Sequence, residues 1–349
     1  MRLGFDAAGM NERGMCVNLH DTAVGAQEIL GHDVCVFYDA DSSNPNVVKK
    51  FSKNLRLVPY SGQADLLRVS EKEKLDFCYR TNAGSNDGVG VNANRVGIHA
   101  VFRHFEPHGD VYAYISEWLA DWMSGGAAPH VPYIVQLPEP TGDLRSRLNI
   151  PADAFVVGRY GGYDQFNIEF AQKGIAEALA KRSNLHFIFV NTQPFIEHER
   201  VHYLPTIVAP QEKSNFIATC DAGINAKKIG ESFGLATAEF LLLGRPVFSW
   251  AGGMDQNHVV MTPKRQWLYT TKSSLVRLLG EYESNAIDAE LAKLAVAKFS
   301  PDAVMKTFDK VFLQGDIRAQ DLSLAPGFEL KRSIQQKLLR AKFRFWKLT

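Results

Sequence analysis

Short apolar runs alternate with amphipathic stretches along most of the chain, and the runs are rich in the β-branched and aromatic residues that favour strands. Such alternation predicts parallel sheets built from β-α-β units. One helix is expected over residues 14–30, ending at Gly31, because glycine accepts the left-handed conformation found after a helix. The strands expected in this first series are residues 2–5, 34–38, 55–59, 75–80, 96–102, 111–115 and 133–137.

A second series begins after residues 137–143, where two prolines and a glycine interrupt the periodicity and predict a linker. We therefore expect an α/β fold with two Rossmann-like domains, residues 1–138 and 139–314. Such halves usually place the functional site in the cleft between them, facing the strand C-termini. The strands expected in the second domain are residues 155–160, 186–191, 222–225 and 246–250. Its expected helices are residues 166–182, 214–220 and 231–243, followed by three more up to about residue 313.

The last part of the chain, residues 315–349, differs from both series. Its final stretch, residues 331–349, contains seven basic residues and no acidic one. Apolar residues fall on one stripe of a predicted helix there, at Leu330, Ile334, Leu338, Ala341, Phe345 and Leu348. Two interpretations remain open: the stripe packs back on the N-terminal domain, or it lies on an anionic membrane surface.

Composition narrows the class of protein. The 349 residues are 46% hydrophobic and 22% charged, which is typical of globular domains. A formal net charge of +1 argues against a nucleic-acid-binding protein. No apolar stretch reaches the ~18 residues of a membrane span, and an acid at position 6 interrupts any secretory signal. The four cysteines show no metal-binding or paired spacing, so we expect a cytoplasmic protein with reduced thiols.

Several common catalytic motifs are absent from the sequence: the glycine-rich dinucleotide fingerprint, the P-loop and the nucleophile elbow. His104 and His108 have the spacing of metal ligands on a helix, but Pro107 argues against a helix there. Asp39 and Asp41 imitate the Asp-x-Asp of metal-dependent sugar transferases, but they lead into a polar turn. We therefore expect no metal cofactor.

Residues 230–247 carry the most specific chemical signal. They predict a loop, a helix N-terminus, a helix, a Gly-Arg-Pro break and a buried strand. A helix N-terminus presents free backbone N–H groups and the positive end of the helix dipole, which suit an anion. Two lysines precede the loop, and Glu231 and Glu239 stand about two helical turns apart. Cations suit a diphosphate and carboxylates suit sugar hydroxyls, although an ordinary amphipathic helix explains the same pattern.

This segment resembles the Glu-x7-Glu motif of retaining glycosyltransferases of family 4 (group 1), with Phe-Gly-Leu after the first glutamate and Gly-x-Pro-Val after the second. Residues 155–162 are similar to the first strand and phosphate loop of that family's donor domain. Residues 31–34 match the Gly-His-x-Val of its acceptor domain, and residues 116–119 its strand-end serine and helix. The resemblance covers most of residues 1–315. It implies the GT-B architecture, in which two Rossmann-like domains face each other across a central cleft.

The resemblance implies roles on the donor side. Arg159 would hold the donor diphosphate, Glu231 would act on the transferred sugar through its hydroxyls, and Glu239 would bind the nucleotide ribose. In many relatives a lysine closely follows the arginine, whereas here the nearest is Lys173, predicted inside a helix. The complete set of implied donor-binding residues is Arg159, Gly161, Gly162, Lys227, Lys228, Ser232, Phe233, Gly234 and Glu239, beside the catalytic Glu231.

On the acceptor side the family's catalytic histidine corresponds to His99, which would contact the donor sugar. His104 and His108 compete for this role, and a buried structural His99 is the other possibility. Gly9 and Gly14 flank the loop after the first strand, which in the family reaches toward phosphates and acceptor; an ordinary turn explains them equally well.

The implied reaction is glycosyl transfer with retention of configuration from a nucleotide sugar, such as a UDP- or GDP-sugar, to a hydroxyl acceptor in glycan biosynthesis. It requires no metal and no other cofactor. The acceptor can be a glycan, a lipid-linked sugar or a glycoprotein glycan. Two other classes remain open: a nucleotide-sugar epimerase or hydrolase on the same fold, and a non-catalytic scaffold at a membrane surface.

Overall fold

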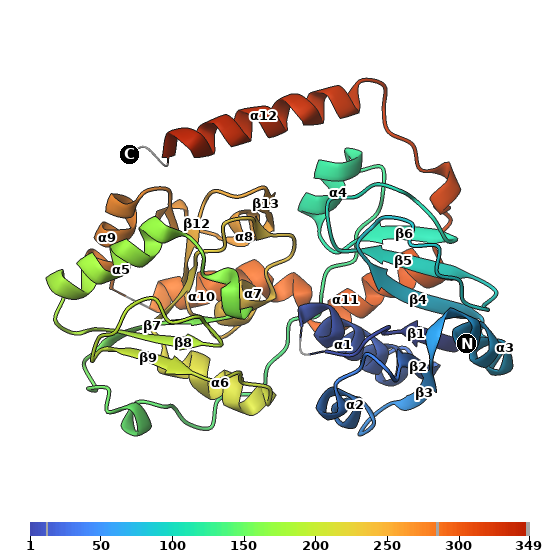
Figure 1. The fold of residues 1–349 in the computed structure, drawn as a ribbon, viewed down its shortest axis with the longest axis horizontal. Helices are drawn as coiled ribbons and strands as arrows, with labels where there is room; N and C mark the ends of the chain where they lie inside the picture. Colours follow the sequence, from blue (N-terminus) through green and yellow to red (C-terminus); the bar gives the residue numbers. More distant parts are fainter. Residues whose placement is uncertain (12, 284–285, 347–349) are drawn as a thin grey trace. The chain divides into compact units, whose positions relative to one another are not determined.

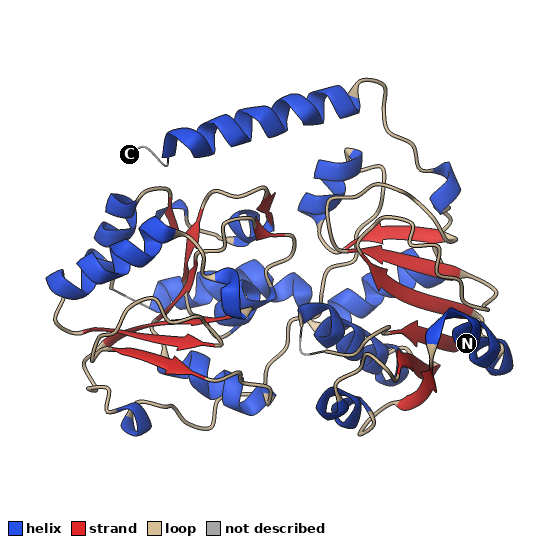
Figure 2. Cartoon of the chain, in the orientation of Figure 1, coloured by secondary structure: helices blue, strands red, loops and turns tan. Residues whose placement is uncertain are grey.

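The structure, a computed structural model, describes residues 1–11, 13–283 and 286–346, without the side chains of residues 286–287 and 342–346. It divides into two compact units (Figure 1). Unit 1 comprises Met1–Ile134 and Phe299–Arg332, and unit 2 comprises Val135–Lys298 and Ser333–Thr349. Each unit contains one six-stranded sheet (Figure 2). The expected α/β class with two separate parallel sheets is confirmed.

The sheet of unit 1 has the order β3-β2-β1-β4-β5-β6, and every neighbouring pair is parallel. This order is that of the doubly wound Rossmann sheet. The strands are β1 (Arg2–Asp6), β2 (Asp33–Asp39), β3 (Arg56–Tyr60), β4 (Phe77–Asn82), β5 (Val96–Ala100) and β6 (Val111–Tyr114). The helices are α1 (Gly14–Glu28), α2 (Pro45–Phe51), α3 (Gly62–Glu73), α4 (Glu117–Ser124) and α11 (Pro301–Phe308), with the short turns η5 (Asp309–Leu313) and η6 (Ala319–Asp321).

Residues 299–332 belong to unit 1, whereas the sequence placed residues up to 314 in the second domain. Helix α11 and the turn η5 supply Phe308 and Phe312, both fully buried, to the core around Phe5 and Tyr79. Burying a phenylalanine side chain contributes about 1.5–3 kcal/mol. Residues 299–332 therefore complete the apolar core against the sheet of unit 1. Local sequence patterns do not show this, because the packed segments are about 200 or more residues apart in sequence.

The sheet of unit 2 has the order β14-β12-β10-β7-β8-β9, also parallel throughout, and β11 pairs with β13 beside it. The strands are β7 (Phe155–Tyr160), β8 (Leu185–Val190), β9 (Val201–Leu204), β10 (Ala222–Asn225), β11 (Gly230–Glu231), β12 (Val247–Trp250), β13 (Asp255–Gln256) and β14 (Leu268–Tyr269). The helices are α5 (Glu169–Lys181), α6 (Pro210–Thr219), α7 (Leu235–Leu242), α8 (Asn257–Met261), α9 (Lys272–Glu281) and α10 (Ala286–Val296), with the 3-10 turns η1 (Ser146–Leu148), η2 (Tyr163–Gln165), η3 (Arg265–Trp267) and η4 (Ala297–Phe299).

Two predicted elements differ from the structure. No strand forms over residues 133–137; Tyr133, Ile134 and Val135 are buried, so their apolar pattern records burial rather than strand pairing. The helix predicted from residue 231 begins at Leu235 instead, because Gly234 adopts a φ of +94° and residues 230–231 form strand β11. Strands β9, β11, β13 and β14 were not predicted.

The last helix, α12 (Phe328–Trp346), crosses the boundary between the two units along the chain. Among the described residues, no helix is long and apolar enough to cross a lipid bilayer.

Candidate functional site: a polar pocket in unit 2

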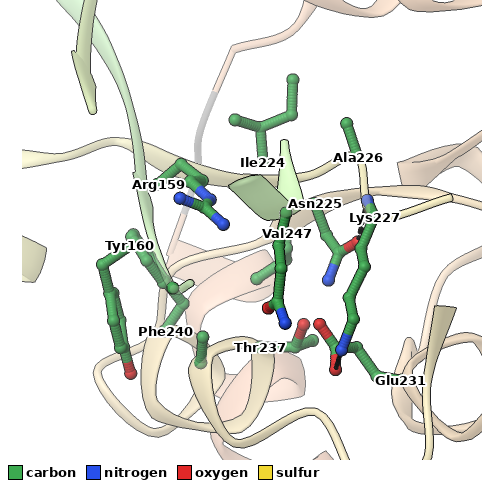
Figure 3. A pocket seen from close by; sticks show the side chains of 13 residues that line it. Arg159, Tyr160, Ile224, Asn225, Ala226, Lys227, Glu231, Thr237, Phe240 and Val247 are labelled. Atoms are coloured by element: carbon green, nitrogen blue, oxygen red, sulfur yellow. Dashed lines mark hydrogen bonds and ion pairs between the residues drawn. The ribbon is translucent and has the colours of Figure 1, made fainter. Parts of the chain in front are cut away.

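A pocket opens in unit 2 where strands β7 and β10 lie side by side (Figure 3). The strand order reverses between these two strands, since β8 and β9 extend the sheet on one side and β12 and β14 on the other. Doubly wound sheets bind ligands at such a switch point, outside the carboxyl ends of the strands. The pocket holds about 430 Å³ of space, part of it open to solvent. Its lining residues include Arg159, Tyr160, Gly161, Asn225, Lys227, Glu231, Ala236, Thr237 and Phe240.

Arg159, near the end of β7, is the buried cation of the pocket. Its guanidinium Nη1 donates to the carbonyl of Asn191 at 3.1 Å and to Thr192 Oγ1 at 2.6 Å, and its Nη2 donates to the carbonyl of Gly162 at 2.8 Å. Burial lowers the pKa of Arg159 to about 10, and the Glu231 carboxylate opposes this shift. The guanidinium therefore stays charged at neutral pH, fixed in direction by the loops after β7 and β8.

Gly161 and Gly162 shape the loop around Arg159. A Cβ atom on Gly161 would stand 2.8 Å from Nη2 of Arg159, so a larger residue would displace the guanidinium. Gly161 lines the pocket, and Gly162 acts through its carbonyl oxygen. The structure thus brings this predicted loop to the pocket.

Lys227 and Glu231 form the second charged feature of the pocket. The lysine follows β10 and its Nζ lies 2.8 Å from Oε2 of Glu231, with 21% and 23% of the two side chains exposed. Figure 3 shows the two side chains meeting, with Arg159 at the other side of the labelled group. Two fixed cations, one carboxylate and the first turn of α7 therefore border one space.

The backbone of Glu231 is held by His258, a residue that the sequence analysis missed. His258 is completely buried and its Nε2 donates to the carbonyl of Trp250 at 2.9 Å. Its Nδ1 therefore accepts the backbone N–H of Glu231, at 3.3 Å. Burial lowers the pKa of His258, which keeps the ring neutral as this pair of bonds requires. The polar run at residues 255–258, one residue after two glycines, was the available signal.

Glu239 is not among the residues that line this pocket, although the sequence placed the two glutamates about two helical turns apart. The carboxylate is buried, with 3% of the residue exposed, and its Oε1 accepts from Nζ of Lys213 on α6 at 2.9 Å. The two glutamates are not separated by two turns of one helix, because Glu231 lies on strand β11 and only Glu239 lies on helix α7.

The remaining donor-side residues surround the start of α7. Ser232 is half-buried and Phe233 is buried, its carbonyl accepting from Asn257 Nδ2 at 2.7 Å. Gly234 precedes the first helical residue. Lys228 is exposed and is not among the residues that line the pocket, and its backbone N–H donates to Oδ1 of Asn167. Lys173 stands on α5, 68% exposed, and pairs with Glu169.

His99 is a core residue of unit 1, which is the structural alternative named above. Only 1% of it is exposed, and it packs among Tyr79, Tyr133 and Phe312. Its Nε2 donates to the carbonyl of Val131 at 2.8 Å, so its Nδ1 accepts from the Tyr79 hydroxyl at 2.5 Å. Both ring nitrogens are engaged inside the core, which leaves neither for a sugar in this conformation.

The other acceptor-side candidates lie on two loops of unit 1. His104 is exposed and His108 is half-buried, both between β5 and β6, where His108 Nδ1 donates to the carbonyl of Glu106 at 2.7 Å. Gly9 and Gly14 lie between β1 and α1. A Cβ on Gly9 would meet Ser42 Oγ at 2.7 Å, whereas Gly14 has open space around it. Across residues 1–11, 13–283 and 286–346, no three acidic, histidine or cysteine side chains gather as they would around a metal ion.

Comparisons with known proteins identify the architecture. No family model matches the sequence, and no curated protein matches it. Solved structures match closely in fold: HepE from Anabaena, in complex with UDP and glucose, superimposes with a TM-score of 0.68 at 15% identity over 90% of this chain and 100% of its own. A glycosyltransferase from Rickettsia africae superimposes with a TM-score of 0.65 at 11% sequence identity, over 92% of this chain and 99% of its own. WaaG, a glycosyltransferase involved in lipopolysaccharide biosynthesis, superimposes with a TM-score of 0.62 at 14% sequence identity, over 90% of this chain and 100% of its own. The chain therefore has the GT-B fold.

Proposed function

We propose that this protein is a retaining glycosyltransferase that moves a sugar from a nucleotide sugar to a hydroxyl acceptor. The observation that carries the proposal is the pocket at the switch point of unit 2, where Arg159 and Lys227 lie beside Glu231. The similarity in fold to HepE, which was solved with UDP-glucose, supports a nucleotide sugar as the donor.

In this proposal the diphosphate lies against Arg159, Lys227 and the start of α7. Two cations and a helix N-terminus stabilise the charge that develops on the leaving nucleoside diphosphate, a preorganised electrostatic effect. Because these groups supply the positive charge, the reaction needs no metal ion. Glu231, held by its backbone, binds hydroxyls of the transferred sugar. Glu239 is proposed to reach the ribose, which requires it to share its carboxylate between Lys213 and the nucleotide.

Retention of configuration follows in this proposal from same-face attack. The leaving diphosphate accepts the proton of the acceptor hydroxyl, so no protein side chain is assigned as general base. The acceptor is a glycan or a lipid-linked sugar bound by unit 1, with the loops carrying Gly9, Gly14, His104 and His108 as its candidate contacts. Because His99 is buried, the exposed His104 and the half-buried His108 remain as the candidate histidines for this role.

Calorimetric titration with UDP, GDP, CMP and NAD, each with and without EDTA, tests the donor site. We expect one nucleoside diphosphate to bind irrespective of EDTA. Lys227→Met should weaken that binding by about 10- to 100-fold, because a charge-assisted hydrogen bond contributes about 1.5–3 kcal/mol. Lys173→Met is the matched control, since it removes a lysine from an exposed Glu–Lys pair of the same sequence separation on α5.

The configuration of the first product, followed by proton NMR with the matching α-linked nucleotide sugar, tests the reaction. An α-linked product supports retention, and a β-linked product would overturn it. Interconversion of the free nucleotide sugars would favour an epimerase. If no nucleotide binds, or if Lys227→Met and Lys173→Met behave alike, the donor-site assignment is wrong and a non-catalytic scaffold becomes the better interpretation.

A further inference from the structure

Helix α12 exposes an apolar stripe that the proposed sugar transfer does not use. Leu330, Ile334 and Leu338 are 68%, 50% and 64% exposed, and all three lie within about 80° of the helix circumference. Ala341 continues the stripe and is also exposed. The predicted continuation at Phe345 and Leu348 lies outside the residues whose side chains the structure describes. Exposed apolar residues that repeat along one helix face mark an interaction surface.

The opposite side of the same helix is the covered one. Phe328, Arg332, Gln336 and Leu339 are partly buried, and their spacing of four, four and three residues defines a single face. Arg332 donates from Nη1 to the carbonyl of Met123 at 2.8 Å, and the Phe328 ring fills the space beside Gly125. The N-terminal part of α12 is thus attached to unit 1 through the face that does not carry the stripe. Within unit 1, the contacts of this helix therefore come from the face opposite Leu330, which is 68% exposed.

The positive charge of this segment favours one kind of binding partner for the stripe, an anionic lipid surface. Residues 331–349 carry seven basic and no acidic residues. On a helical projection Lys331 and Lys337 lie at opposite edges of the stripe, each about 60° from its centre. Lysines in such positions keep their ammonium groups in the aqueous layer while their stems cover apolar surface. A second copy of this helix would bring like charges together, and a nucleic acid would leave the apolar stripe in water.

We propose that α12 lies in the plane of an anionic lipid bilayer, with Leu330, Ile334 and Leu338 in the acyl boundary and the flanking cations among the lipid phosphates. Apolar burial and attraction to anionic headgroups then act together, as in interfacial amphipathic helices. This inference is independent of the proposed sugar transfer and holds whether or not the protein binds a nucleotide.

Co-sedimentation of the full chain with vesicles tests the inference. The probe vesicles are phosphatidylcholine with about 30% phosphatidylglycerol, compared with pure phosphatidylcholine. We expect binding to the anionic vesicles, no measurable binding to the neutral ones, and loss of binding in about 0.5 M NaCl, where exposed charges are strongly screened.

Two neighbouring substitutions separate insertion from simple attraction. Ile334→Glu and Gln335→Glu each add one negative charge to an exposed position of the helix, but only the first falls on the stripe. Gln335→Glu should lower the partition coefficient about fivefold, the effect of one charge. Ile334→Glu should lower it at least tenfold further, because it also removes an apolar side chain from the acyl boundary.

Equal losses in the two variants would overturn the in-plane placement, and so would equal binding to neutral and anionic vesicles or no binding to either. Size-exclusion chromatography with light scattering tests whether a second copy of the chain covers the stripe instead. If the wild type is a dimer and Ile334→Glu dissociates it, the stripe is an interface with a second copy of the chain and the proposal is overturned. Nucleotide titration of Ile334→Glu should match the wild type, which keeps this test separate from that of the donor site.

Discussion

The ion pair between Lys227 and Glu231 leads us to expect that removing the Glu231 carboxylate strengthens nucleotide binding, although a contact is lost. Lys227 Nζ lies 2.8 Å from Glu231 Oε2, and about a fifth of each side chain is exposed, 21% and 23%. Exposed pairs contribute about 0.2–1 kcal/mol, and removal of one partner of a fully buried pair costs about 3–5 kcal/mol. We therefore assign this partly buried pair about 1–2 kcal/mol.

A bound diphosphate must compete with Glu231 for the same ammonium group, and it meets the negative charge of the carboxylate. Glu231→Gln removes both penalties while keeping the shape of the side chain. We expect the variant to bind the free nucleoside diphosphate about 5- to 30-fold more tightly, the equivalent of 1–2 kcal/mol. Transfer should collapse in the same variant, because the amide cannot replace the carboxylate at the sugar hydroxyls.

Isothermal titration calorimetry of wild type, Glu231→Gln, Lys227→Met and the double variant measures the affinities and the coupling between the two residues. Glu169→Gln is the matched control: it removes the carboxylate of the Lys173 pair, in which the glutamate side chain is 79% exposed, and should leave nucleotide affinity unchanged. Weaker binding by Glu231→Gln, of the size seen for Lys227→Met, would refute the reasoning, since the carboxylate would then support the anion rather than compete with it.

Three further predictions concern unit 1 and the loop that holds Glu231. Burial lowers the pKa of His99 to about 4, below the ~6.5 of an exposed histidine, so unfolding takes up a proton between these pH values. Urea titrations should show the free energy of unfolding of the wild type falling by about 3 kcal/mol more than that of His99→Gln as the pH drops from 6.5 to 4; parallel curves would contradict the assignment. Gly14→Ala should raise the free energy of unfolding by about 0.4–1 kcal/mol in the same assay, because it has open space and loses less chain entropy. Gly230→Ala should lower the free energy of unfolding, and by more than Gly14→Ala raises it, because Gly230 has a φ of +84° and the new Cβ would collide with the backbone carbonyl of Asp255. Equal effects of the two substitutions would refute this. Arg80→Met leaves the Asp6 carboxylate buried without its guanidinium partner at 3.0 Å and should cost about 3–5 kcal/mol of unfolding free energy, whereas a cost under about 1 kcal/mol would show that the pair is not buried in solution.

Much of the architecture followed from local pattern. The alternation of apolar runs and amphipathic stretches predicted two parallel sheets, and strands β7 and β10 begin and end at the residues expected. Arg159, Gly161, Lys227 and Glu231 were all named from the sequence and all line one pocket. These features are local, because strand and loop preferences act over a few residues and strands of a β-α-β series deliver their C-terminal loops to one edge of a sheet.

Tertiary packing decided the rest. His258 holds Glu231 across 27 residues of sequence, through a hydrogen bond that only the folded β11–β13 pairing creates. His99 is buried in the core, where the Tyr79 hydroxyl and the carbonyl of Val131 satisfy both of its ring nitrogens. These partners are distant in sequence, so the position of His99 near a strand end could not predict its burial.

The end of the chain shows the same division most clearly. The sequence determined that residues 330–341 carry an apolar stripe and an excess of positive charge, since both depend only on residue type and the helical repeat. It could not determine which side of that helix the protein covers. The contacts of Phe328 and Arg332 with residues about 200 positions earlier decide this, and they leave the stripe exposed.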